Sequence, residues 1–184
     1  GEQPYINLDN GASTPTFAPI WEAAWRGWSA PVAAGHEIAD EVKSICGDVL
    51  GAPCGDYDVI FTGNTTESIN LVADSMSHSR GDGTETVVLN TFLEHNSNEL
   101  PWRVAPGVTL LRLDVDGDGF VDFGQLEALL GAYNERGEHG SQRIKLVTVS
   151  GASNVLGTYN DLAAISRVAH RCGAQLLVDA AQLV

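Results

Sequence analysis

Helical and strand patterns of hydrophobic residues alternate along the chain. Apolar residues from Ile38 to Val49 recur at helical spacing, which predicts an amphipathic helix over residues 36–50. Short runs of β-branched and apolar residues, bounded by turn residues, predict strands. The predicted helices cover residues 36–50, 66–77, 97–102, 123–133 and 161–172, and the predicted strands cover residues 59–61, 86–89, 108–113, 144–149 and 176–178.

This alternation predicts the fold class. Strands separated by helices of about ten residues form βαβ units, whose strands lie parallel in one sheet. We therefore expect an α/β protein, a three-layer sandwich with a mainly parallel sheet. Residues 135–142 are polar and contain Gly137 and Gly140. They predict a surface loop within one domain.

Four polar clusters follow predicted strands. In open α/β sheets, ligands bind outside the carboxyl ends of the strands. We therefore expect the four clusters to share one rim, where together they indicate a binding site more strongly than any one alone. The clusters are Thr62–Glu67, Glu94–Asn98, Ser150–Asn154 and Asp179–Gln182.

The first cluster leads directly from a predicted strand into a predicted helix. Asn64 can cap that helix, and Glu67, three residues later, can complete a capping box. The N–H groups at such a helix start, together with the hydroxyls of Thr65 and Thr66, can bind an anion. An ordinary capped helix is the alternative interpretation. The absence of GxGxxG and GK[ST] patterns argues against dinucleotide and P-loop phosphate binding.

The other clusters carry side chains suited to a flat, charged ligand. His95 can stack on an aromatic ring or transfer protons, although a loop histidine can also be merely exposed. Asp179 directly follows the last predicted strand, where a carboxylate can keep a pyridine nitrogen protonated or cap a following helix. The amides of Asn154 and Gln182 can hydrogen-bond an oxygen on such a ring.

Five ordered segments carry a family resemblance. They read LDNGASTP, FTGNTTESIN, EHNSNELPW, SNVLGT and LVDAAQ, at residues 8–15, 61–70, 94–102, 153–158 and 177–182. Together they closely resemble the class V aminotransferase family, especially its cysteine desulfurase and selenocysteine lyase branch. The resemblance runs from about residue 6 to the end of the chain.

The resemblance implies a fold-type I enzyme that uses pyridoxal 5'-phosphate, acts on a small-molecule amino-acid substrate and forms a homodimer. Residues 16–184 would be the N-terminal half of its large, cofactor-binding domain, and residues 1–15 would line the site entrance through Asn10, Gly11 and Ala12. The family's motifs assign the following roles: Thr65 and Thr66 bind the phosphate, His95 stacks on the ring, Asn154 and Gln182 contact the ring oxygen, and Asp179 pairs with the ring nitrogen.

The implied reaction removes sulfur or selenium from cysteine, with His95 and Asp179 as the catalytic residues. Another activity of the family, such as an epimerase or a transaminase-like reaction, stays open. Asn96 stands where the family often has a second histidine, and neither Lys43 nor Lys145 fits the Schiff-base lysine. We expect that lysine beyond the Asp-x-x-Gln motif, outside this chain, so the fragment alone should be inactive and bind the cofactor weakly.

Composition excludes several kinds of partner. Ten basic and 24 acidic residues give a net charge of −14, which argues against a nucleic-acid partner. No apolar run reaches the ~20 residues needed to span a bilayer, so we expect no membrane partner. The three cysteines are far apart in the chain and suit a reducing compartment, which favours a cytoplasmic location.

The segment Asp114–Asp122 resembles a calcium loop. Asp114, Asp116 and Asp118 occupy ligand positions of an EF-hand. However, Gln125 stands where a bidentate glutamate is required, and a predicted strand precedes the loop in place of a helix. A non-enzymatic calcium-binding module is therefore the alternative from a different class of function. The histidines lack zinc-site spacing, so we expect no metal in the enzyme.

Overall fold

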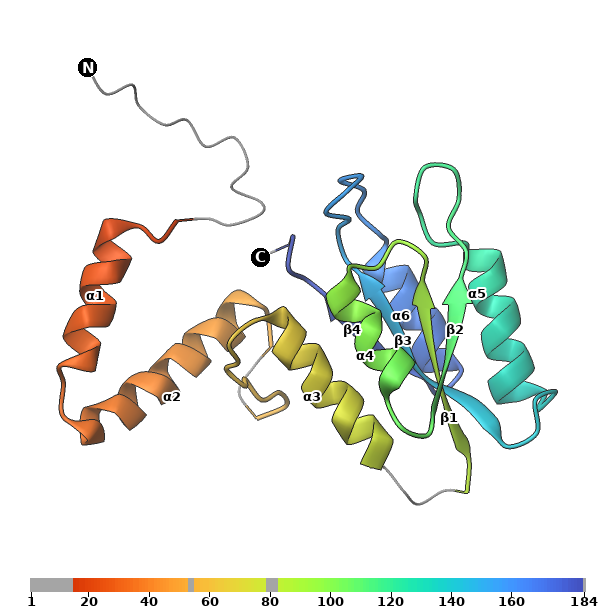
Figure 1. Ribbon diagram of the computed structural model, residues 1–184, viewed down its shortest axis with the longest axis horizontal. Helices are drawn as coiled ribbons and strands as arrows, with labels where there is room; N and C mark the ends of the chain where they lie inside the picture. The colour runs from red at the N-terminus through yellow and green to blue at the C-terminus, as the bar shows by residue number, and fades with distance from the viewer. Residues whose placement is uncertain (1–14, 53–54, 79–82, 184) are drawn as a thin grey trace. The chain divides into compact units, whose positions relative to one another are not determined.

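The computed structural model describes residues 15–52, 55–78 and 83–183. The chain divides into two compact units, Gly1–Phe61 and Thr62–Val184, whose elements are labelled in Figure 1. The predicted entrance residues Asn10, Gly11 and Ala12 lie outside the described residues. The expected division of the chain after residue 15 stays a prediction.

Two helices make up the described helical part of the first unit, α1 (Ala18–Trp28) and α2 (Val32–Val49). α1 contains a proline in its first turn, and α2 directly follows Pro31. Proline is favourable at a helix start, because a backbone N–H there would have no hydrogen-bond partner within the helix. This start signal explains why α2 begins at Val32, whereas apolar periodicity alone places its start at residue 36. In α1, Trp21 and Trp25 each meet Trp28 edge to face, with ring centroids 5.9 and 6.3 Å apart.

The predicted strand at residues 59–61 is wrong. These residues adopt no regular secondary structure, and Ile60 and Phe61 are 75% and 54% exposed. A strand requires a hydrogen-bonded neighbour along its length, and none of the strands in the described part of the chain pairs with this segment. The local β propensity of Val59-Ile60-Phe61 is therefore not sufficient to form a strand.

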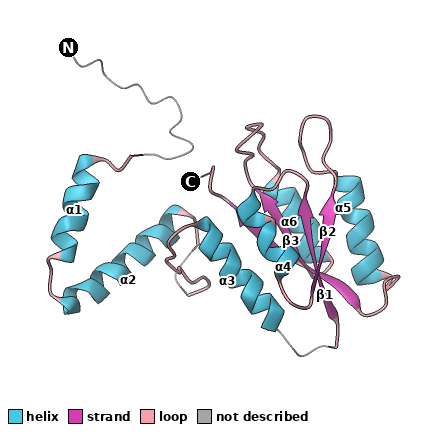
Figure 2. Cartoon of the chain, in the orientation of Figure 1, coloured by secondary structure: helices cyan, strands magenta, loops and turns pink. Residues whose placement is uncertain are grey.

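One parallel sheet forms the centre of the second unit, which confirms the predicted α/β class (Figure 2). Its strands are β1 (Glu85–Thr91), β2 (Val108–Leu113), β3 (Gln142–Ser150) and β4 (Gln175–Asp179), in the order β2-β1-β3-β4. All three pairings are parallel. Each strand lies at a position predicted from the sequence.

Helices pack on both faces of this sheet. Side chains alternate along each strand, so Val87 and Leu89 pack with α5 (Phe123–Leu130) and α6 (Leu162–Arg171), whereas Val88 packs with α3 (Thr65–His78) and α4 (Leu100–Val104). The helix predicted to reach residue 133 ends at Leu130 and continues as a π turn, Gly131–Glu135. Within the described residues, no helix is long and apolar enough to cross a membrane.

The face that carries α3 and α4 becomes polar at the carboxyl ends of its strands. Asn90 on β1 lies in register with Thr148 on β3, and Ser150 lies in register with Asp179 on β4. All four side chains are buried. Because alternate residues of a strand share a face, these polar groups follow the apolar side chains of the same face in the direction of the chain. This edge of the sheet is where the candidate site lies.

Candidate functional site

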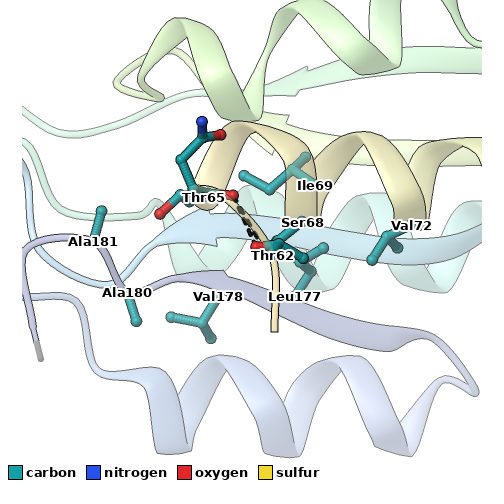
Figure 3. A pocket seen from close by; sticks show the side chains of 10 residues that line it. Thr62, Thr65, Ser68, Ile69, Val72, Leu177, Val178, Ala180 and Ala181 are labelled. Atoms are coloured by element: carbon teal, nitrogen blue, oxygen red, sulfur yellow. Dashed lines mark hydrogen bonds between the residues drawn. The ribbon is translucent and has the colours of Figure 1, made fainter. Parts of the chain in front are cut away.

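An open cleft of about 570 Å³ lies between the start of α3 and the end of β4 (Figure 3). Ile69, Leu177 and Val178 give it an apolar part, and Thr65 a hydroxyl. This volume falls within the range of roughly 300–1,000 Å³ that is common for small-molecule sites. The complete lining is Thr62, Asn64, Thr65, Ser68, Ile69, Val72, Leu177, Val178, Ala180 and Ala181.

Asn64 caps the start of α3 as predicted, but Glu67 accepts the N–H of Gly63 and not that of Asn64, so the predicted capping box is only half formed. Asn64 Oδ1 accepts the N–H of Glu67 at 2.9 Å, and Glu67 Oε2 accepts the N–H of Gly63 at 2.6 Å. The first-turn N–H groups of a helix have no partner within the helix and lie at the positive end of its dipole. The start of α3 therefore offers N–H groups and the Thr65 hydroxyl to an anion in the cleft.

The loop after β1 links His95 to this turn through Ser97. Thr66 Oγ1 lies 2.7 Å from Ser97 Oγ, which lies 3.0 Å from His95 Nδ1. Ser97 belongs to a short 3-10 helix, η1 (Asn96–Asn98), and His95 caps it by accepting the N–H of Ser97. Ser97 thus joins the second threonine of the turn to the imidazole. No role for Ser97 is predicted from the sequence.

Asp179 ends β4 at the same edge and is 6% exposed. Its Oδ1 accepts the N–H of Ala181 at 3.1 Å, so the carboxylate supports a turn and does not cap a helix. Val178, Ala180 and Ala181 around it all line the cleft. The end of β4 and the threonine turn are therefore brought together, as their place on one rim predicts.

The two predicted amides lie in turns near this edge. Asn154 is exposed in a turn of the loop that follows β3, and Gln182 is exposed in the turn after Asp179. The first loop is fixed at its base, because the N–H of Gly151 donates to the carbonyl oxygen of Asp179 at 2.9 Å. Neither amide belongs to the lining of the cleft, so their predicted contact with a ring oxygen stays a prediction.

Glu94 is a polar centre that sequence reasoning missed. It accepts hydrogen bonds from Thr91, Asn98 and Ser150. Burial raises the pKa of the Glu94 carboxyl above its usual range, and these hydrogen bonds oppose that rise. In the sequence, only its position directly before His95 points to a role for Glu94. Its contact with Ser150 leaves no local pattern, because Ser150 lies 56 residues away along the chain.

The acidic segment Asp114–Asp122 uses its carboxylates within the loop. Asp116 Oδ1 accepts the N–H groups of Asp118 and Phe120, both at 2.9 Å, and Asp122 caps α5 by accepting the N–H of Gln125. No group of three or more potential metal ligands occurs among the described residues. These contacts support the interpretation of the segment as a turn between strand and helix.

The fold and the cleft together define a class: a parallel α/β domain with an open cleft at the carboxyl end of a strand. Residues 6–184 match the family model of class-V aminotransferases. The chain therefore belongs to the class V aminotransferase family.

Curated relatives give the same result across nearly the whole chain. It is 38% identical to a cysteine desulfurase of Dickeya dadantii over 99% of the chain and 45% of that relative. It is 33% identical to a probable cysteine desulfurase of Methanothermobacter thermautotrophicus over 98% of the chain and 44% of that relative. The chain thus spans less than half the length of these relatives.

A solved structure supports the fold. The apo structure of a cysteine desulfurase from Thermococcus onnurineus superposes with a TM-score of 0.75 at 26% sequence identity. The superposition covers 93% of this chain and 42% of that structure. This chain therefore matches less than half of that structure.

Proposed function

We propose that this chain is the cofactor-binding part of a cysteine desulfurase that uses pyridoxal 5'-phosphate. The observation that carries the proposal is the cleft in which the threonine turn of α3 meets the end of β4, with His95 linked to that turn through Ser97. The desulfurase names of the curated relatives support the choice of reaction.

The residues around the cleft suit the chemical groups of this cofactor. N–H groups at a helix start and threonine hydroxyls suit a phosphate, and the apolar side chains of Ile69 and Val178 suit a ring. The Asp179 carboxylate, at the buried end of β4, suits a protonated ring nitrogen. The donor set therefore fits the cofactor at both its anionic and its cationic end.

Each residue then has a defined task. Thr65 and Thr66 would hold the phosphate, His95 would stack on the ring, and Asp179 would keep a proton on the ring nitrogen. When bound, the cofactor supplies an electron-withdrawing ring for reactions at the amino-acid substrate. Asn154 and Gln182 would hydrogen-bond the ring oxygen, and Asn10, Gly11 and Ala12 would form the substrate entrance, as the family's motifs imply.

The hydrogen bond from Ser97 determines the tautomer of a neutral His95 ring. An amide N–H can only donate, so Nδ1 of His95 must accept from Ser97, and a neutral ring carries its proton on Nε2. The protonated Nε2 is then the atom of His95 that is available to donate a proton during the reaction.

Binding of 4'-deoxypyridoxine 5'-phosphate to the 184-residue chain tests the site. This probe has the ring and the phosphate but no aldehyde, so it cannot react with Lys43 or Lys145. We expect Asp179→Asn to weaken its binding about tenfold and to leave inorganic phosphate binding unchanged, because a charge-assisted hydrogen bond to the ring becomes a neutral one. Asp122→Asn, which alters the cap of α5, is the control. Equal binding of the probe by the chain and by Asp179→Asn would contradict the assignment.

For the whole enzyme we propose a cytoplasmic homodimer that converts cysteine to alanine and releases sulfur. The complete gene product, incubated with L-cysteine and a thiol reductant, should form alanine and sulfide in equal amounts. Formation of a keto acid or of the opposite enantiomer, without sulfide, would instead identify another activity of the family.

A further inference from the structure

The carboxylate of Glu94 connects the loop that carries His95 to two strands. Its Oε1 accepts from Thr91 Oγ1 at 2.6 Å, at the end of β1. Its Oε2 accepts from Asn98 Nδ2 at 2.7 Å and from Ser150 Oγ at 2.8 Å, at the end of β3. One side chain thus fixes both ends of the loop, residues 92–98, to each other and to the neighbouring strand.

The surrounding hydrogen bonds require an acceptor at the position of Oε2. Asn98 Oδ1 accepts from the indole N–H of Trp102 at 3.2 Å and from Thr148 Oγ1 at 2.7 Å. An indole N–H can only donate, so the oxygen of the Asn98 amide must face Trp102. The amino group of Asn98 must then face Glu94, where only an acceptor satisfies it.

The opposite side of the same loop presents the functional groups of the site. His95 and Ser97 are fixed to each other by the Ser97 N–H to Nδ1 bond of 3.1 Å, and Ser97 reaches Thr66. Asn98, which follows Ser97 directly, is fully buried and held by Glu94. The position of His95 and Ser97 beside the start of α3 therefore depends on the buried contacts of the adjacent residues.

We propose that Glu94 is a positioning residue that holds His95 and Ser97 in place at the start of α3, by accepting hydrogen bonds from Asn98 and Ser150. This inference deepens the proposed function and rests on it for the identity of the ligand. Both oxygens of Glu94 accept hydrogen bonds from the loop and the strands, so the role proposed for it is to position its neighbours.

Three variants of the 184-residue chain test this role. Glu94→Ala removes the acceptor, whereas Glu94→Gln can keep an oxygen toward Asn98 and Ser150 and turn its amino group to Thr91. Glu99→Ala is the matched control, since Glu99 is the next acidic residue and binds Arg112 and Arg103. The readouts are the ¹⁵N signals of the His95 ring, assigned with His95→Gln, and the affinity for 4'-deoxypyridoxine 5'-phosphate.

We expect His95 to stay protonated on Nε2 in the unmodified chain, in Glu94→Gln and in Glu99→Ala. Glu94→Ala should show exchange between the two tautomers and bind the probe about tenfold more weakly, which corresponds to the loss of about one hydrogen bond to a charged group. Recovery by Glu94→Gln is the result that a general loss of stability does not produce.

Several outcomes overturn the inference. The inference is wrong if Glu94→Ala folds and its His95 ¹⁵N signals are unchanged. It is also wrong if Glu94→Gln shows the same tautomer exchange and weaker binding as Glu94→Ala. If Glu94→Ala does not fold, Ser150→Ala removes one donor and should produce the same tautomer exchange, with about threefold weaker binding. Unchanged signals in Ser150→Ala then overturn the inference. A chain that fails to bind the probe, yet shows tautomer exchange on Glu94→Ala, contradicts the proposed function and supports the positioning role.

Discussion

Asn98 Oδ1 has two buried donors, and removing both should cost more than the sum of the single losses. Thr148→Val deletes the hydroxyl at 2.7 Å, and Trp102→Phe deletes the indole N–H at 3.2 Å. All three residues are fully buried. Either single variant leaves the oxygen one donor, whereas the double variant leaves it none, so the desolvation of a buried acceptor is then uncompensated.

The magnitudes follow from these contacts. Thr148→Val should lower the free energy of unfolding by about 1 kcal/mol, the net value of one hydrogen bond. Trp102→Phe should lower it by about 2 kcal/mol, because a smaller ring also leaves a cavity. The double variant should lose about 4–5 kcal/mol, since an unsatisfied buried group adds about 1–2 kcal/mol.

Urea unfolding followed by far-ultraviolet circular dichroism measures these free energies. The control pair is Trp102→Phe with Val149→Ala, because Val149 packs on the opposite face of the sheet and should add independently. A coupling below about 0.5 kcal/mol between Trp102 and Thr148 would refute the reasoning, since it would mean that Asn98 Oδ1 finds another donor.

Two further predictions concern the loops at the site. Burial raises the pKa of Glu94 above the ordinary 4.5, so the native state holds its proton more tightly than the unfolded state. This contribution to stability is present below pH 4.5 and is lost as the pH rises through the native pKa. The difference in free energy of unfolding between the unmodified chain and Glu94→Gln should therefore decrease as the pH rises through this range. A difference that does not change with pH would contradict the raised pKa. The hydrogen-bond partners of Glu94 are neutral groups, on Thr91, Asn98 and Ser150. Gly119 has φ of +87°, and an added Cβ would lie 2.6 Å from Leu156 Cδ1 and 3.0 Å from Leu93 Cδ1. Gly119→Ala should therefore destabilise the chain by about 1–3 kcal/mol in urea unfolding, whereas Gly117→Ala, with open space around its Cβ, should change stability by less than about 1 kcal/mol.

The elements of the second unit could be predicted because their signals are local. Strand β2 occupies the predicted residues 108–113, and Asn64 caps α3 by accepting the N–H of Glu67, as predicted. Alternating strand and helix patterns imply parallel pairing, since a helix between two strands returns the chain to the end of the sheet where the first strand began. Because parallel strands end on the same side of the sheet, the polar clusters that follow them could be predicted to share one rim.

The errors occur where structure depends on distant partners. Residues 59–61 have the composition of a strand, but strand formation depends on a neighbour elsewhere in the chain. Likewise, the Ser97 that joins Thr66 to His95 lies 31 residues from Thr66, and no local pattern indicates that contact.

The sequence alone determined the fold class, the family and the order of the site segments, because periodicity and motifs are properties of neighbouring residues. Only the tertiary structure decided that Glu94 is a buried acceptor for Thr91, Asn98 and Ser150. The physical reason is that a hydrogen bond depends on distance and direction in space, which the folding of β1 beside β3 establishes.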